Sequence, residues 1–347
     1  MNMASGVIVA KAKSMHGEQL QKEQYHELLH KRSVAEIAGY LKHETQYAEA
    51  LKDVRENNIH RGQLENILRQ DMFKKTMKLY RYADSSQKKY YQLPMQQIEI
   101  DLILSRIRVL ISREYEDAIA EFPIFLKAYT SFDLLRLGNV HTYDDLLDVL
   151  KKTMYYEPLL QFRVAKGKEN NIDYTGIETL LHQQYYAHTF QVIDKVLKGS
   201  SHKAVKELYQ LEVELSNITK IYRFKKYFNA REDVIRDSLV PVRCRLSTNQ
   251  LEELIAQPNA QAFLKKLQGS MYDLGIDDHA SHIFIEHYTA RYLFEKARKN
   301  VYYSSDAPLV YTSYLLLENR QLENIINIIE GVRYSVQVED IEKMLIY

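Results

Sequence analysis

The sequence predicts an all-α protein built from three similar helical units, and three observations support this prediction. First, the 347 residues include only 11 Gly and 6 Pro, about 5% of the chain, whereas about 12% is usual. Strand-rich folds need turn residues at short intervals, and this chain has too few of them. Second, apolar residues recur at helical spacing after capping residues. Third, this arrangement occurs three times along the chain.

Each unit is predicted to open with a capped helix. Ser33 is followed three residues later by Glu36, a spacing at which each side chain accepts a hydrogen bond from the backbone amide of the other residue. Apolar residues follow four and eight positions after the cap. The same arrangement recurs at Thr142 and at Ser247, which lie 109 and then 105 residues further along.

Two further landmarks follow each cap in the same order. The second landmark is an aliphatic residue followed by Glu at the start of a helix, with an aromatic residue nine positions after the aliphatic one. The third is a pair of apolar residues three positions apart in a long amphipathic helix. In chain order the second landmark begins at Leu64, Ile177 and Ile285, and the third begins at Leu104, Ile218 and Ile325. Together they predict units of about 105–115 residues, spanning 1–125, 126–235 and 236–347.

Charge and composition exclude several classes of function. With 47 basic and 46 acidic residues the net charge is +1, so nothing indicates a basic surface for nucleic acid. The glycine spacings exclude both G-x-G-x-x-G and the Walker A loop. One cysteine, Cys244, excludes an internal disulfide and a cysteine-based zinc site. No apolar run approaches the roughly 18 residues that a membrane span needs, so we expect a soluble, intracellular protein.

One motif indicates a different class of protein. His26-Glu27-Leu28-Leu29-His30 is a complete H-E-x-x-H, which on a helix places two imidazoles on one face with Glu as the general base. Glu49 follows at a spacing typical of the third ligand of zinc peptidases. The alternative interpretation is therefore a zinc metallopeptidase. Against it, the cap at Ser33 confines the motif to the last turn of its helix, and nothing else in the chain resembles a substrate cleft.

Several segments resemble a known family. They are Ala10-Lys11-Ala12-Lys13-Ser14-Met15, Ser33-Val34-Ala35-Glu36-Ile37, Thr45-x-Tyr47, Glu212-Val213-Glu214-x-x-Asn217-Ile218, Tyr314-x-x-x-Glu318 and Glu323-Asn324-Ile325. The chain resembles the C subunit of bacterial and archaeal V/A-type rotary ATPases, whose eukaryotic relative is the d subunit. Two positions depart from the family pattern. Lys13-Ser14 stands in place of Arg-Gly, and Val332 follows Gly331 in place of Lys.

The resemblance implies a non-catalytic rotor subunit with no cofactor and no metal. It implies three units arranged with pseudo-threefold symmetry, like a funnel, and a function that couples the central stalk to the membrane rotor ring. The coupled process is ion transport linked to ATP hydrolysis or synthesis, with either protons or sodium as the ion. The implied partners are the D and F subunits of the central stalk and the c/K-type proteolipid subunits of the ring. The implied location is the cytoplasmic face of the membrane, peripheral through the ring.

The polar faces of the three helices that carry the third landmark are the predicted contact surface for the stalk. Arg106, Asn217 and Asn324 are expected to line this surface, because equivalent positions of a three-unit array would face one shared centre. The alternative, above all for the two Asn, is that each residue caps or braces its own unit.

Overall fold

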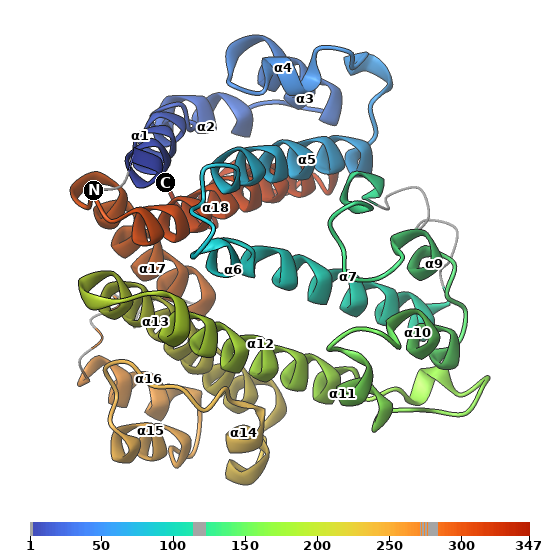
Figure 1. The fold of residues 1–347 in the computed structure, drawn as a ribbon, viewed down its shortest axis with the longest axis vertical. Helices are drawn as coiled ribbons and strands as arrows, with labels where there is room; N and C mark the ends of the chain where they lie inside the picture. The colour runs from blue at the N-terminus through green and yellow to red at the C-terminus, as the bar shows by residue number, and fades with distance from the viewer. Residues whose placement is uncertain (1–2, 114–122, 271, 273, 275, 277–283) are drawn as a thin grey trace. The chain divides into compact units, whose positions relative to one another are not determined.

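The computed structural model describes residues 3–113, 123–270 and 284–347, together with Tyr272, Leu274 and Ile276. Over these residues all regular structure is helical and no strand is found, which confirms the predicted all-α class (Figure 1). Within the same ranges, no helix combines the length and the apolar character needed to cross a membrane.

The chain folds into two compact units. The first takes in residues 1–85, 198–235 and 242–347, and the second takes in 86–197 and 236–241. The first unit contains α1 (Met3–Gly17), α2 (Lys22–Leu29), α3 (Val34–Glu44), α4 (Ala48–Leu51), η1 (Glu56–Asn58), α5 (Arg61–Tyr80), α13 (Gly199–Arg223), η4 (Phe224–Phe228), α15 (Thr248–Ile255), α16 (Ala260–Gln268), α17 (Ile285–Tyr303), α18 (Ala307–Arg333) and α19 (Val338–Glu342). The second contains α6 (Lys88–Tyr91), α7 (Leu93–Ser112), η2 (Ile124–Leu126), α9 (Leu134–Gly138), α10 (Tyr143–Leu150), α11 (Tyr156–Leu160), η3 (Glu169–Asn171) and α12 (Tyr174–Val196). The residues of α14 (Glu232–Ser238) are divided between the two.

Two of the predicted helix caps form complete capping boxes. At the start of α10, the Thr142 hydroxyl accepts from the Asp145 amide at 3.1 Å, and the Asp145 carboxylate accepts from the Thr142 amide at 3.0 Å. At the start of α15, Ser247 and Gln250 exchange the same two bonds at 3.2 and 2.9 Å. Each box pairs amides at the helix start that have no partner within the helix.

The third predicted cap, at Ser33, is correct for one of its two bonds. The Ser33 hydroxyl accepts from the Glu36 amide at 3.1 Å, as predicted. The Glu36 carboxylate instead accepts from the amide of Arg32 at 2.9 Å. The reciprocal bond has therefore moved one residue towards the N-terminus, and the helix start is still capped.

We expect Thr142→Ala to lower the free energy of unfolding by about 1 kcal/mol, because the Asp145 amide loses its side-chain acceptor. Thr142→Ser keeps the hydroxyl and serves as the matched control. Chemical denaturation of both variants measures the effect. A loss of the same size in the Ser variant would contradict the capping role, since only the Ala variant lacks the oxygen.

The same order of elements follows each cap. Two short helices lead to two long helices, and the sets are α3, α4, α5 and α7, then α10, α11, α12 and α13, then α15, α16, α17 and α18. In the first two sets a 3-10 turn with the same sequence, Glu-Asn-Asn, precedes the first long helix, a repeat that the three landmarks do not include. The residues of the third landmark lie buried on the second long helix of each set. The three-unit organisation and its pseudo-threefold arrangement stay predictions, which superposition of the three sets would test.

The long helices of different sets pack in a regular pattern. Within the second compact unit α7 packs on α12, and within the first α13 packs on α17 and α18 packs on α5. In each pair, the second long helix of one set meets the first long helix of the next, and the last set meets the first. Figure 1 shows α18 lying along α5. The C-terminal part of the chain is therefore packed on its N-terminal part.

A cluster of apolar side chains fills part of the interior between α18 and the N-terminal helices. Burial of apolar surface contributes roughly 25 cal/mol per Å², so this cluster holds distant segments of the first compact unit together. Gly331 lets α19 approach α18, because a β-carbon there would lie 2.4 Å from Cδ1 of Ile341. Buried members of the cluster include Leu28, Ile37, Leu41, Leu64, Leu68, Leu322, Ile325, Ile328, Ile329 and Ile341.

Candidate functional site

The structure places the three predicted interface residues in the interior. Arg106, Asn217 and Asn324 are 3%, 1% and 1% exposed. The guanidinium of Arg106 donates through Nη2 to the carbonyl oxygen of Val140. Asn324 donates to the carbonyl oxygen of Ile346 at 2.7 Å and accepts from its amide at 3.1 Å. The bonds of Asn324 lie within its own predicted unit, as the bracing alternative requires, whereas Arg106 bonds Val140, a residue of the next predicted unit.

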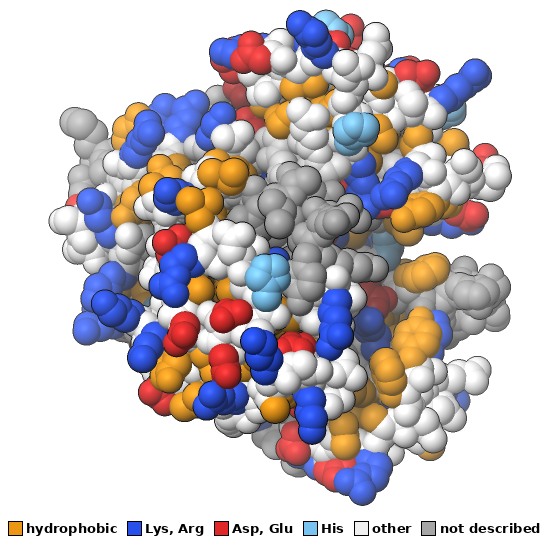
Figure 2. All heavy atoms as spheres, turned by 90° about the vertical axis from the view of Figure 1, so that its right-hand side faces the viewer, with side chains coloured by type: hydrophobic (Ala, Val, Ile, Leu, Met, Phe, Trp, Pro, Cys, Tyr) orange, Lys and Arg blue, Asp and Glu red, His pale blue; other side chains and the backbone are white. Residues whose placement is uncertain are grey.

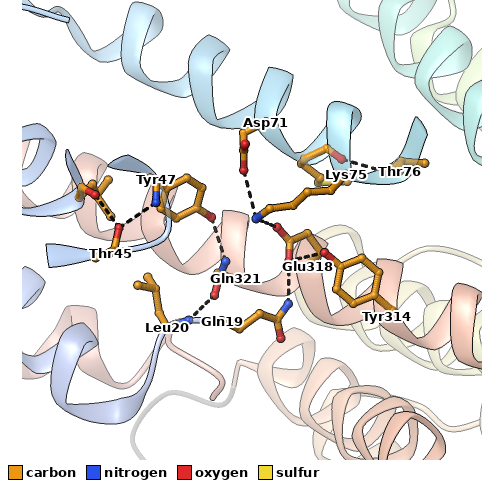
Figure 3. Close-up of polar contacts among 12 residues, drawn as sticks. Gln19, Leu20, Thr45, Tyr47, Asp71, Lys75, Thr76, Tyr314, Glu318 and Gln321 are labelled. Carbon is orange, nitrogen blue, oxygen red and sulfur yellow. Dashed lines mark hydrogen bonds and ion pairs between the residues drawn. The ribbon is translucent and has the colours of Figure 1, made fainter. Parts of the chain in front are cut away.

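A buried carboxylate on α18 is the centre of the polar contacts in Figure 3. Oε1 of Glu318 lies 2.5 Å from Nζ of Lys75 on α5. Oε2 accepts from Nε2 of Gln19, after α1, at 2.8 Å and from the hydroxyl of Tyr314 at 3.3 Å. Glu318 is 2% exposed, and a buried carboxylate is costly unless it is paired and hydrogen-bonded. We call Gln19, Asp71, Lys75, Tyr314 and Glu318 the Glu318 cluster.

Lys75 supplies the positive charge of the Glu318 cluster. Its Nζ also lies 3.1 Å from Oδ2 of Asp71, one helical turn earlier on α5. Burial opposes the ammonium form, but the charges of Glu318 and Asp71 outweigh it and raise the pKa of Lys75. Burial, and after it the Glu318 carboxylate, also raise the pKa of Tyr314, so that its hydroxyl stays a donor. The cluster thus combines two carboxyl groups with one ammonium group.

Gln321, one turn after Glu318 on α18, joins two N-terminal segments. Its Oε1 accepts from the amide of Leu20 at 2.7 Å, and its Nε2 donates to the hydroxyl of Tyr47 at 2.9 Å. The amide of Tyr47 donates in turn to the Thr45 hydroxyl at 3.2 Å. Both ends of the buried amide group therefore have partners, and the side chain fixes α18 against the chain on either side of α2 and α3 (Figure 3).

The sequence indicated part of the Glu318 cluster and missed the rest. The spacing of Tyr314 and Glu318 places them on one helix face, and their contact follows from it. Asp71 and Lys75 have the same spacing, so the sequence contains the signal for a pair on the surface of one helix. Nothing in it shows that Lys75 meets Glu318, because these residues are 243 positions apart.

The H-E-x-x-H motif lies at the end of α2, as predicted, with His30 as the C-terminal cap. The rings of His26 and His30 stack with their centroids 4.6 Å apart. Nδ1 of His30 lies 2.8 Å from the carbonyl oxygen of His26. The two imidazoles therefore contact each other and the backbone at an exposed helix end.

The two carboxylates of the peptidase alternative are engaged elsewhere. Glu27 pairs with Lys31 at 3.4 Å, and Glu49 pairs with Lys52 at 2.6 Å. In the part of the chain that the structure describes, no three His, Cys, Asp or Glu side chains are grouped so that they could hold a metal ion. The structure therefore gives the zinc metallopeptidase no support.

Charges of both signs share the face seen in Figure 2. There, Lys and Arg side chains are interspersed with Asp and Glu, as expected for a chain with a net charge of +1. Proteins that follow a nucleic-acid backbone instead gather basic side chains into a continuous area.

The fold and the buried contacts define the class of protein as a helical scaffold, in which polar groups of the interior hold helices together. The family described as ATP synthase (C/AC39) subunit matches residues 8–344. The C subunit of the A-type ATP synthase of Methanosarcina mazei is 24% identical over 343 residues, which cover 97% of this chain and 91% of that protein. The protein of the same name from Methanosarcina acetivorans is 24% identical over 328 residues, 93% of this chain and 87% of that protein.

The chain belongs to the ATP synthase (C/AC39) subunit family. This membership confirms the resemblance to the C subunit of V/A-type rotary ATPases. It also agrees with the expectation that the chain is a non-catalytic subunit of a rotary ATPase.

Proposed function

We propose that this chain couples the central stalk of a V/A-type ATPase to the membrane rotor ring. The observation that carries the proposal is the family match over residues 8–344. In this role the chain transmits torque for ion transport linked to ATP hydrolysis or synthesis. Its partners are the D and F subunits of the stalk and the c/K-type proteolipid subunits of the ring, at the cytoplasmic face of the membrane.

The packing of α18 supports a load-bearing role. Closely packed interiors resist deformation and transmit strain. In the first compact unit α18 packs on α1, on α5 and on α19, so one helix contacts segments near both ends of the chain. The Glu318 cluster adds a buried ion pair to the contact between α18 and α5. A scaffold fastened in this way suits an adaptor that passes force between two partners.

Binding to two separate preparations tests the proposal. The purified chain is mixed with a complex of the D and F subunits, and separately with a detergent-solubilised proteolipid ring. We expect it to co-purify with both preparations. Binding to neither, or to only one of them, would overturn a coupling role, because coupling requires two mating surfaces.

The predicted interface residues need their own test, because they are buried in the free chain. A direct contact of Arg106, Asn217 or Asn324 with the stalk requires that binding uncovers these side chains. Asn217→Ala and Asn324→Ala are compared with the wild type in stalk affinity, after circular dichroism has shown that they fold. A loss of affinity would support the contact, and unchanged affinity would leave only the bracing role.

A further inference from the structure

One hydrogen-bond arrangement occurs three times, once on the second long helix of each set. In each copy a buried polar side chain lies on the second long helix of one set. It binds a backbone amide in the segment that leads to the next cap, and it binds the hydroxyl of a buried Tyr beyond that cap. The three side chains are Glu99 on α7, Glu214 on α13 and Gln321 on α18. We call each arrangement an anchor.

The first anchor lies in the second compact unit. Oε2 of Glu99 accepts from the hydroxyl of Tyr155 at 2.7 Å, and Oε1 accepts from the amide of Ser131. Glu99 is 5% exposed. The amide of Tyr155 donates to the hydroxyl of Thr153 at 3.2 Å, which fixes the backbone that presents the ring.

The second anchor lies in the first compact unit. Glu214, which is 2% exposed, accepts from the hydroxyl of Tyr272 and from the amides of residues 244–246, the last three before the cap at Ser247. These amide bonds measure 2.7, 2.8 and 3.1 Å. The amide of Tyr272 donates to the Ser270 hydroxyl at 3.2 Å, as at Tyr155.

Gln321 forms the third anchor with equivalent groups. It accepts from the Leu20 amide and donates to the Tyr47 hydroxyl, and the Tyr47 amide donates to the Thr45 hydroxyl. The sequence register is the same in two of the copies. Gln321 and Glu214 each stand four and seven residues before the third-landmark pair of their helix, whereas Glu99 stands five and eight residues before its pair. In every copy the hydroxyl residue lies two positions before the Tyr.

We infer that Glu99, Glu214 and Gln321 are three copies of one anchoring device, and that the third copy, which closes the last set on the first, is neutral because of its surroundings. In the first two copies a carboxylate accepts from Tyr. In the third the amide donates to Tyr47, so the direction of that bond is reversed. This inference concerns the closure of the chain and does not depend on the stalk-to-ring role.

The surroundings of the third anchor give the physical reason for an amide. Glu318 and Asp71 already place two carboxyl groups there, with Lys75 between them. A further carboxylate one turn from Glu318 would be buried beside like charges, which disfavours its ionised form. The titratable groups around this anchor, in the part of the chain that the structure describes, include Glu318 and Tyr314 on α18, Asp71 and Lys75 on α5, Tyr47 before α4, Tyr25 on α2 and His16 on α1.

The test introduces the missing carboxyl with Gln321→Glu and follows the unfolding equilibrium against pH. Burial and the neighbouring carboxyls should raise the folded-state pKa of the introduced group above its unfolded value. The deficit relative to the wild type is then full above the folded pKa and disappears as pH falls to the unfolded value, about 4.3. We expect at least a tenfold shift of the equilibrium constant towards unfolding at about pH 8, and a much smaller one at about pH 5.

Gln321→Met is the uncharged control, and it also provides the second measurement. It should lose stability by the same factor at both pH values, because it removes the bonds without adding a charge. Hydrogen exchange of the Leu20 amide should rise at least tenfold in this variant, while exchange of the amides at 244–246 stays as in the wild type. A pH-independent deficit in Gln321→Glu, or an unchanged Leu20 exchange rate in Gln321→Met, would overturn the inference.

Discussion

Replacing Lys75 with Met is expected to lower the free energy of unfolding by about 3–5 kcal/mol, because it removes one partner of a buried ion pair. The Lys75 ammonium lies 2.5 Å from Glu318, which is 2% exposed, and 3.1 Å from Asp71. Without it, two carboxyl groups remain near each other with no cation in the Glu318 cluster. Chemical denaturation near neutral pH measures the loss.

Two further variants show whether this loss comes from an unpaired charge. The double variant Lys75→Met with Glu318→Met removes both partners, and it should lie within about 2 kcal/mol of the wild type. Lys343→Met removes a lysine from an exposed pair with Asp340, and it should leave the unfolding free energy nearly unchanged. A double variant as unstable as the single one would show that the lost packing of Lys75, and not its charge, sets the effect.

The pH dependence of the Lys75 contribution follows from its raised pKa. A group whose folded-state pKa is raised contributes stability that is fully present below its unfolded pKa, which for lysine is 10.5. This stability is lost as pH rises through the folded-state value. The difference between the wild type and Lys75→Met should therefore stay constant from about pH 6 to about pH 9 and decrease only at higher pH.

The helix caps could be predicted from the sequence because a cap is a local structure. Thr142 and Ser247 meet their partners three residues away, and the spacing alone determines which atoms can bond. The prediction that Glu36 accepts from the Ser33 amide was wrong for an equally local reason. A glutamate at this position of a helix can bond either of two adjacent backbone amides, and the sequence does not show that Glu36 selects that of Arg32 and not that of Ser33.

The burial of the predicted interface residues could not be predicted from the sequence, because it depends on contacts with distant segments. A polar side chain on an amphipathic helix is expected on its outer face, and only the packing of other helices can cover it. For Asn324 the covering segment is the C-terminus at Ile346, which bonds both ends of its amide. Likewise H-E-x-x-H is a match over five residues, but a zinc site also needs a third ligand that only the tertiary structure can supply.

The second large effect is expected at the anchor on α13. Glu214→Leu should lower the free energy of unfolding by at least about 3 kcal/mol, because several donors lose their acceptor at once and each buried donor left unpaired costs about 1–3 kcal/mol. The donors are the hydroxyl of Tyr272 and the amides of residues 244–246. Tyr272→Phe removes one donor and keeps the acceptor, so its loss should be clearly smaller. Equal losses would contradict a role for Glu214 as a shared acceptor.

Cys244 provides a local measurement of the same anchor, because it is the one cysteine and lies within the anchored segment. Burial, followed by the carboxylates of Glu214 and Glu207, raises the pKa of its thiol to about 11, so that little thiolate is present near neutral pH. Glu214→Leu both releases the segment and removes one of these charges, and modification by a thiol reagent should become at least tenfold faster. Glu207→Gln removes the other charge but keeps the amide bonds, so it should accelerate the reaction far less. If the two variants react at the same rate, the charge alone controls the thiol and Glu214 does not hold this segment in place.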